Sequence, residues 1–126
     1  MTPEAADYLQ HSRRSLTDAQ KALAAGIYVP AAREAYIAAL NAARAIIFEK
    51  LTIASKTHTG THALLHRLVH DGLKVDRRTL DILSKGFEVK TKADYGPYEE
   101  LGEEEARGLV LLAETLFAQV ESELGK

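Results

Sequence analysis

The sequence contains no cysteine and no tryptophan, and only 6% of its residues are aromatic. The absence of cysteine excludes disulfide bonds, thiolate zinc sites and a cysteine nucleophile, and it fits a reducing compartment. Because aromatic residues are scarce, the core must be aliphatic. No apolar run approaches the roughly 20 residues of a membrane span, and the N-terminal residues lack the layout of a signal peptide. We therefore expect a cytoplasmic protein with no membrane partner.

What is present fits an ordinary globular chain. The 126 residues are 46% hydrophobic and 27% charged, which predicts a single domain over residues 1–126. The net charge of −2 is unevenly distributed: basic residues outnumber acidic ones between 74 and 92, and acidic residues dominate from 94 onward. This asymmetry is compatible with local phosphate binding, and equally with solvated helix faces of opposite charge.

Apolar residues recur at helical spacing along nearly the whole chain, and no strand-like alternation competes with them. Thr2 and Pro3 are typical of a helix start, and Gly26 of a helix end. An alanine-rich second helix is expected to end near Leu51, and a short third helix near Asp71. The pattern predicts an all-α, up-and-down helical bundle of four long helices plus one short helix.

The fourth predicted helix begins at an N-cap, Asp76, and its buried stripe is predicted to be Leu80, Leu83 and Phe87. The segment 94–97, Asp-Tyr-Gly-Pro, is expected to end it, because glycine and proline both interrupt helices. The last helix has the clearest periodicity, with apolar residues following the i, i+3, i+4, i+7 pattern from Ala106 to Leu124.

Four of the five histidines lie four residues apart, at His58, His62, His66 and His70. A pair with this spacing on a helix can bind zinc. Successive four-residue steps drift by about 40° around a helix, so the four side chains cannot converge on one ion. We therefore predict neither a metal site nor a cofactor, and interpret His62, His66 and His70 as ordinary residues of a short helix.

His58 differs from the others because it lies at the junction between a polar loop and the third helix, beside Lys56 and Thr57. The free N–H groups of a helix N-terminus, together with a lysine and hydroxyl groups, can bind a phosphate. His58 is then a candidate general acid or base. The alternative is that Thr57 or Thr59 caps the helix and His58 is merely exposed.

A second candidate element closes the fourth helix, where Lys90, Asp94 and Tyr95 lie within two turns. Lys90 and Asp94 are four residues apart and can simply pair to stabilise the helix. Alternatively, Lys90 and Asp94 belong to a phosphate-binding site in which Tyr95 donates a hydrogen bond. The predicted site thus has His58 and Tyr95 as catalytic candidates, with Lys56, Thr57, Lys90 and Asp94 binding the ligand.

Three segments in order resemble a known family: Ala35-Tyr36-Ile37-Ala38-Ala39-Leu40-Asn41-Ala42-Ala43-Arg44-Ala45, then Ser55-Lys56-Thr57-His58-Thr59-Gly60, then Lys92-Ala93-Asp94-Tyr95-Gly96. The sequence resembles a small stand-alone HEPN-domain protein over about residues 5–122. The resemblance implies a helical bundle, commonly a homodimer, that associates with RNA or nucleotides. It also implies a small nucleotidyltransferase as partner, in a toxin–antitoxin or defence module.

Active HEPN ribonucleases carry an arginine followed by histidine after four to six residues and cleave without metal. In them the arginine holds the scissile phosphate, while the histidine moves protons as a ribose hydroxyl attacks. No arginine of this chain is followed by histidine at that distance, and the nearest equivalent is Lys90-x4-Tyr95. Lysine lacks the bidentate fork of arginine, and tyrosine is a poor base at neutral pH.

The sequence thus predicts an RNA- or nucleotide-binding protein with a degenerate ribonuclease motif, paired with a small nucleotidyltransferase. Two alternatives remain open. One is a weak metal-independent ribonuclease that uses His58. The other is a non-catalytic protein-interaction subunit.

Overall fold

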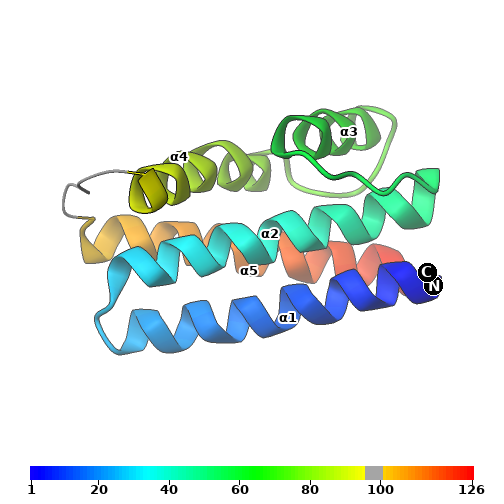
Figure 1. The fold of residues 1–126 in the computed structure, drawn as a ribbon. Helices are drawn as coiled ribbons and strands as arrows, with labels where there is room; N and C mark the ends of the chain where they lie inside the picture. The colour runs from blue at the N-terminus through cyan, green and yellow to red at the C-terminus, as the bar shows by residue number, and fades with distance from the viewer. Residues whose placement is uncertain (96–100) are drawn as a thin grey trace.

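The computed structural model describes residues 1–95 and 101–126, with side chains described except at 93–95. Within these residues the chain is all-α and has no strand, which confirms the predicted helical bundle (Figure 1). The elements are α1 (Pro3–Ala24), α2 (Tyr28–Leu51), α3 (His58–His70), the 3-10 turn η1 (Arg77–Leu80), α4 (Asp81–Tyr95) and α5 (Glu103–Leu124). The segment after Tyr95, including Gly96 and Pro97 of the predicted helix end, lies outside the described residues.

The start and end of α1 follow the predicted signals. The Thr2 side chain caps the helix by accepting a hydrogen bond from the backbone N–H of Ala5, and Pro3 is its first residue. Gly26 follows the helix with a φ of +74°, a left-handed conformation that favours glycine. One further tie lies inside the bundle, where the buried hydroxyl of Ser12 donates to the Ala38 carbonyl of α2 at 2.6 Å.

The centre of the fold is α2, which packs against the other four α-helices. Its buried side is built largely from alanine, so the neighbouring helices can approach its backbone closely. Eleven of its residues are buried: Ala31, Ala32, Ala35, Tyr36, Ala38, Ala39, Ala42, Ala43, Ala45, Ile46 and Ile47. Because α2 is buried on nearly every side, it is the element that positions α3 and α4.

Two details of α4 differ from the sequence predictions. Asp76 does act as an N-cap, accepting from the Arg78 N–H at 2.9 Å, but the turn that it caps is the 3-10 turn η1 rather than α4 itself. Phe87 was predicted to be buried and is 38% exposed. The reason is that Gly86, not Phe87, continues the buried stripe of Leu80 and Leu83 and lies against Tyr36 of α2. Phe87 is thereby turned toward α3.

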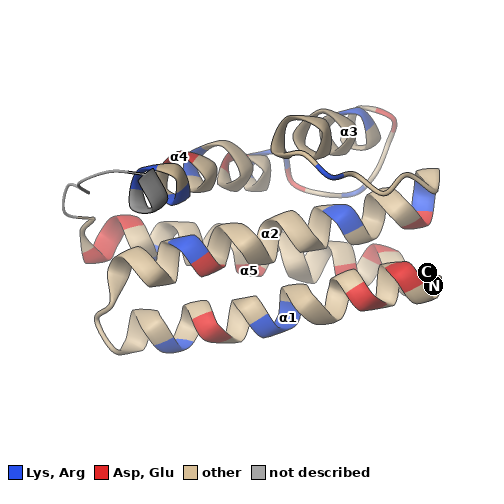
Figure 2. Ribbon diagram, in the orientation of Figure 1, with Lys and Arg blue, Asp and Glu red and all other residues tan. Residues whose placement is uncertain are grey.

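The charge asymmetry of the sequence is visible on the structure. Basic residues lie along α4 and acidic residues lie at the start of α5, at the same end of the bundle (Figure 2). Two of the basic side chains pair with acids of their own segment, at Lys92–Glu88 (3.7 Å) and Arg78–Asp76 (3.0 Å), and in α5 Arg107 pairs with Glu103 (2.8 Å). These exposed pairs favour the interpretation of solvated helix faces over that of a continuous basic patch. None of the described helices is long and apolar enough to cross a membrane.

Candidate functional site

The polar turn before α3 is held by a chain of hydroxyl groups. The Thr57 hydroxyl caps the helix by accepting from the Gly60 N–H at 2.9 Å. The buried Thr61 hydroxyl donates to the Thr57 carbonyl at 2.7 Å, and it lies 2.5 Å from the Ser55 hydroxyl. A side chain at Gly60 would bring its Cβ within 2.8 Å of the Thr57 Oγ1. The turn therefore requires these small residues, and it fixes His58 as the first residue of α3.

His58 is half-buried and contacts two aromatic side chains from other helices. Its Nδ1 lies 3.0 Å from the Tyr36 hydroxyl of α2. Its ring stacks on Phe87 of α4, with centroids 3.9 Å apart and planes within 11°. The alternative that His58 is merely exposed is therefore wrong, although Thr57 does cap the helix. Helices α2, α3 and α4 each contribute one ring to this contact.

Burial sets the protonation of both partners in the Tyr36–His58 pair. Desolvation lowers the pKa of His58, and desolvation raises the pKa of Tyr36 against a smaller opposite effect of Arg44. Both groups are therefore neutral at pH 7. A protonated phenol and a neutral imidazole suit a bond in which the Tyr36 hydroxyl donates to Nδ1, leaving Nε2 available for a ligand.

Arg44 connects this pair to the loop before α3. Its Nη2 donates to the Lys56 carbonyl at 3.2 Å. Its Nε is buried and has no hydrogen-bond partner among the described residues. A buried guanidinium nitrogen without an acceptor is costly, and only the Nη end of Arg44, which contacts the exposed loop, is within reach of a ligand. We name Tyr36, Arg44, Lys56, His58 and Phe87 the His58 cluster.

The structure places some of the predicted site residues in the His58 cluster, and it does not describe the side chains of others. His58 and Lys56 belong to the cluster, and the Thr57 hydroxyl oxygen is engaged in capping α3. Lys90 is half-buried on α4 one turn beyond Phe87, so the two lie on the same side of that helix. The side chains of Asp94 and Tyr95 lie outside the described residues. Whether the end of α4 joins His58 stays a prediction.

Sequence reasoning missed three members of the cluster. Tyr36 and Arg44 stand in the α2 segment that carries the family resemblance, but they received no role there. Their spacing of eight residues places them on the same side of α2, which is a detectable signal. Phe87 was assigned to the core, and its contact with His58 could not be read from spacing.

The remaining histidines of α3 continue from the cluster along the helix. The His62 ring lies 5.9 Å from the His58 ring, and the Nε2 atoms of His62 and His66 are 2.9 Å apart. His70 instead contacts Asp71 at 3.4 Å. Among the described residues, no group of three or more histidine or acidic side chains is placed to hold one metal ion.

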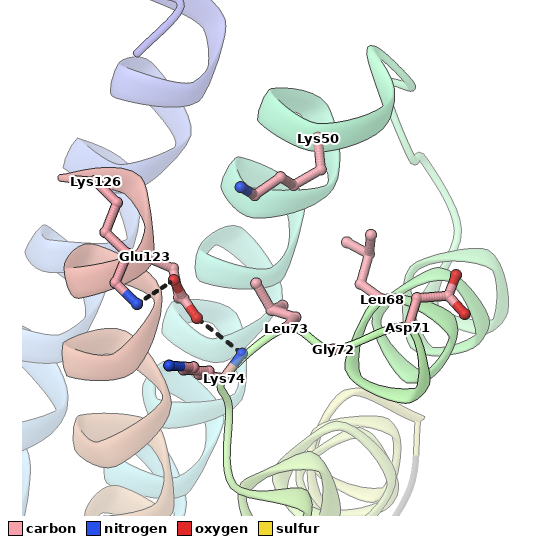
Figure 3. A pocket seen from close by; sticks show the side chains of 8 residues that line it. All are labelled: Lys50, Leu68, Asp71, Gly72, Leu73, Lys74, Glu123 and Lys126. Atoms are coloured by element: carbon pink, nitrogen blue, oxygen red, sulfur yellow. Dashed lines mark hydrogen bonds and ion pairs between the residues drawn. The ribbon is translucent and has the colours of Figure 1, made fainter.

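A separate cavity of about 350 Å³ lies near the C-terminal ends of α2, α3 and α5 (Figure 3). Its wall includes the buried carboxylate of Glu123, which accepts from the Lys74 N–H at 2.8 Å and from the Lys126 Nζ at 3.0 Å. These bonds lower the pKa of Glu123. Helix C-termini carry partial negative charge, which Lys50 and Lys126 offset. We therefore assign the lysines of this cavity to stabilising the helix ends.

The histidine pKa values predict how stability depends on pH. Because the pKa of His58 and that of His62 are below the ordinary value, the unfolded chain binds protons more readily than the folded one below about pH 6.5. The Tm is therefore expected to fall as the pH drops from 7.5 to 5.5, and His58→Gln should reduce this fall. Calorimetry at several pH values measures it. A Tm that is constant or rises as the pH falls over this range would contradict the prediction, because among the residues that the structure describes only Glu34, whose pKa burial raises, acts in that direction.

Comparisons with known proteins agree with this architecture. The model of the HEPN domain matches residues 5–123. The chain is 28% identical over 119 residues to a UPF0332 protein of Archaeoglobus fulgidus, covering 94% of this chain and 93% of that protein. It is also similar to the crystal structure of TT1696 from Thermus thermophilus, with a TM-score of 0.77 and 23% identity over 96% of this chain and 98% of the other. That second likeness shows the fold alone. From the family match over nearly its whole length, the chain belongs to the HEPN domain family.

Proposed function

We propose that this protein binds RNA or a nucleotide at the His58 cluster. The observation that carries the proposal is the stacked His58–Phe87 pair, which follows a loop that Arg44 contacts through the Lys56 carbonyl. Aromatic faces bind bases by stacking, and an arginine at the same place supplies a partner for phosphate. Membership of the HEPN family agrees with a nucleotide-related ligand.

In this proposal each member of the cluster has a distinct task. Arg44 and the exposed Lys56 contact phosphate, and the half-exposed Phe87 extends the stack of His58 toward a base. Tyr36 holds the His58 ring in place through its hydroxyl. Lys90, one turn beyond Phe87, extends the phosphate contact toward Asp94 and Tyr95 at the end of α4. The proposal also includes a homodimer in the cytoplasm, paired with a small nucleotidyltransferase.

Binding of a fluorescently labelled single-stranded RNA, followed by anisotropy, tests this proposal. Phe87→Ala removes one stacking face and is expected to weaken binding about tenfold, consistent with about 1–3 kcal/mol per stacked base. Lys56→Ala should reduce the slope of log K against log salt by about one. Lys21→Ala on α1 serves as the matched control, since Lys21 is exposed and lies outside the cluster. Equal affinity of the Phe87 and Lys56 variants and the parent would refute the proposal.

A second candidate function rests on the Tyr36–His58 hydrogen bond. In the other tautomer, in which Nδ1–H donates to the Tyr36 oxygen, the unprotonated Nε2 of a neutral His58 can accept a proton from a ribose 2′ hydroxyl as it attacks the neighbouring phosphate; the bond from phosphorus to the 5′ oxygen breaks, and that oxygen takes a proton from water. We expect any such cleavage to be weak and to survive EDTA. His58→Ala should abolish it. Absence of cleavage above background across varied RNAs would leave binding alone as the function.

A further inference from the structure

We propose that His62 and His66 form a surface chelate for a divalent transition metal ion that favours square or octahedral geometry, as Cu²⁺ and Ni²⁺ do. The two residues are one turn apart on α3, and their Nε2 atoms form a hydrogen bond of 2.9 Å in which one N–H donates to the other nitrogen. Their ring centroids lie 4.6 Å apart. An ion that binds both nitrogens replaces the proton of this hydrogen bond, which moves to Nδ1 of the donor ring as the donor histidine changes tautomer, and the nitrogens already lie at the separation of two ligands on one ion.

The separation of the nitrogens selects among metals. With metal–nitrogen bonds of about 2.0–2.1 Å, two nitrogens 2.9 Å apart subtend about 90° at the ion. A tetrahedral angle at the same bond length needs a separation of about 3.3 Å. Cu²⁺ and Ni²⁺ take 90° angles, whereas Zn²⁺ in proteins is usually tetrahedral. The pair thus fits the first two ions better than zinc.

The surroundings of the pair suit an entering cation. His66 is exposed and His62 is half-buried, so an ion can reach both nitrogens and keep several water ligands. The His58 ring lies on the other side of His62, at 5.9 Å, and limits the movement of that imidazole. Asp81 of α4 acts electrostatically on His62 and supplies negative charge nearby. Because no group of three ligands exists among the described residues, we place two protein ligands and water on the ion.

Metal titration of the intact chain, carrying no polyhistidine tag, tests the chelate. Calorimetry is expected to show one Cu²⁺ bound per chain at this site, and electron paramagnetic resonance to show nitrogen ligands. His62→Ala and His66→Ala should each weaken Cu²⁺ binding at least tenfold. His70→Ala and His11→Ala are the controls, because both residues are exposed and neither contacts the pair.

The choice of metal gives a second readout. Ni²⁺ should bind more tightly than Zn²⁺, and this preference should be lost in either variant of the pair. Circular dichroism checks that the variants keep their helices, which is expected because neither side chain is in the core. Unchanged Cu²⁺ binding in both His62→Ala and His66→Ala would overturn the proposal. So would a preference for Zn²⁺ over Ni²⁺ in the parent.

Discussion

Leu65→Ala is expected to lower the free energy of unfolding by about 3 kcal/mol, within the range of about 2–5 kcal/mol for buried leucine truncations. Leu65 is fully buried and, with Leu68, carries the apolar contact of α3 with the rest of the bundle. Other described ties of this region are the hydroxyl chain at Thr57, the bond from Arg44 to the Lys56 carbonyl and the contacts of His58 with Tyr36 and Phe87. Removal of the leucine therefore loosens the helix that begins with His58.

Urea denaturation followed by circular dichroism measures this loss, and Leu111→Ala is the matched control. Leu111 is 62% exposed on α5, so the same substitution there is expected to change the free energy of unfolding by no more than about 0.5 kcal/mol. Hydrogen exchange should also accelerate at the amides of α3 in the Leu65 variant. Equal effects of the two substitutions would mean that α3 is not anchored through Leu65.

Most of the fold could be predicted because its signals are local. Thr2 and Gly26 mark the ends of α1 through their own backbone and side-chain chemistry, and both assignments are confirmed. The spacing of apolar residues along α2 predicted an alanine-rich helix with a buried face, since a helix repeats every 3.6 residues, although burial extends beyond one face. These inferences need no knowledge of which helix packs on which.

The His58 cluster could be predicted only in part, because its contacts join residues far apart in the sequence. Tyr36 and His58 are 22 residues apart, and Phe87 comes from a third helix. Spacing alone could not decide whether Gly86 or Phe87 continues the buried stripe of α4. Gly86 is three residues after Leu83 and Phe87 is four, and both spacings lie on the same side of a helix. The choice between them depends on how closely α4 approaches α2, which is a property of the packed bundle.

The close approach of α4 to α2 leads to the second large effect, at Gly86. A Cβ added there would lie 2.8 Å from the Tyr36 Cβ and 3.1 Å from its Cδ1. The Tyr36 Cβ is attached directly to the backbone of α2, so the contact can be relieved only by separating the two helices. We expect Gly86→Ala to lower the free energy of unfolding by about 2 kcal/mol, because overpacking by about 1–3 kcal/mol outweighs the gain in helix propensity.

Gly108→Ala is the matched control, because a Cβ at this exposed position of α5 meets nothing within 4 Å. There the propensity gain acts alone, and the substitution should stabilise the protein by about 0.5–1 kcal/mol. Chemical denaturation of the two variants should therefore give changes of opposite sign. A stabilising Gly86→Ala would show that α2 and α4 can separate at little cost.

Gly86→Ala should also disturb the His58 cluster, since Tyr36 holds His58 and Phe87 directly follows Gly86. A shift of α4 away from α2 moves Phe87 relative to the His58 ring and moves Tyr36 relative to Nδ1. RNA affinity measured well below the unfolding transition should then fall in Gly86→Ala and remain at the parental value in Gly108→Ala. A Gly86→Ala variant that is destabilised but binds RNA with full affinity would show that the geometry of the cluster does not depend on this helix contact. It would also argue against stacking on Phe87 as the basis of binding.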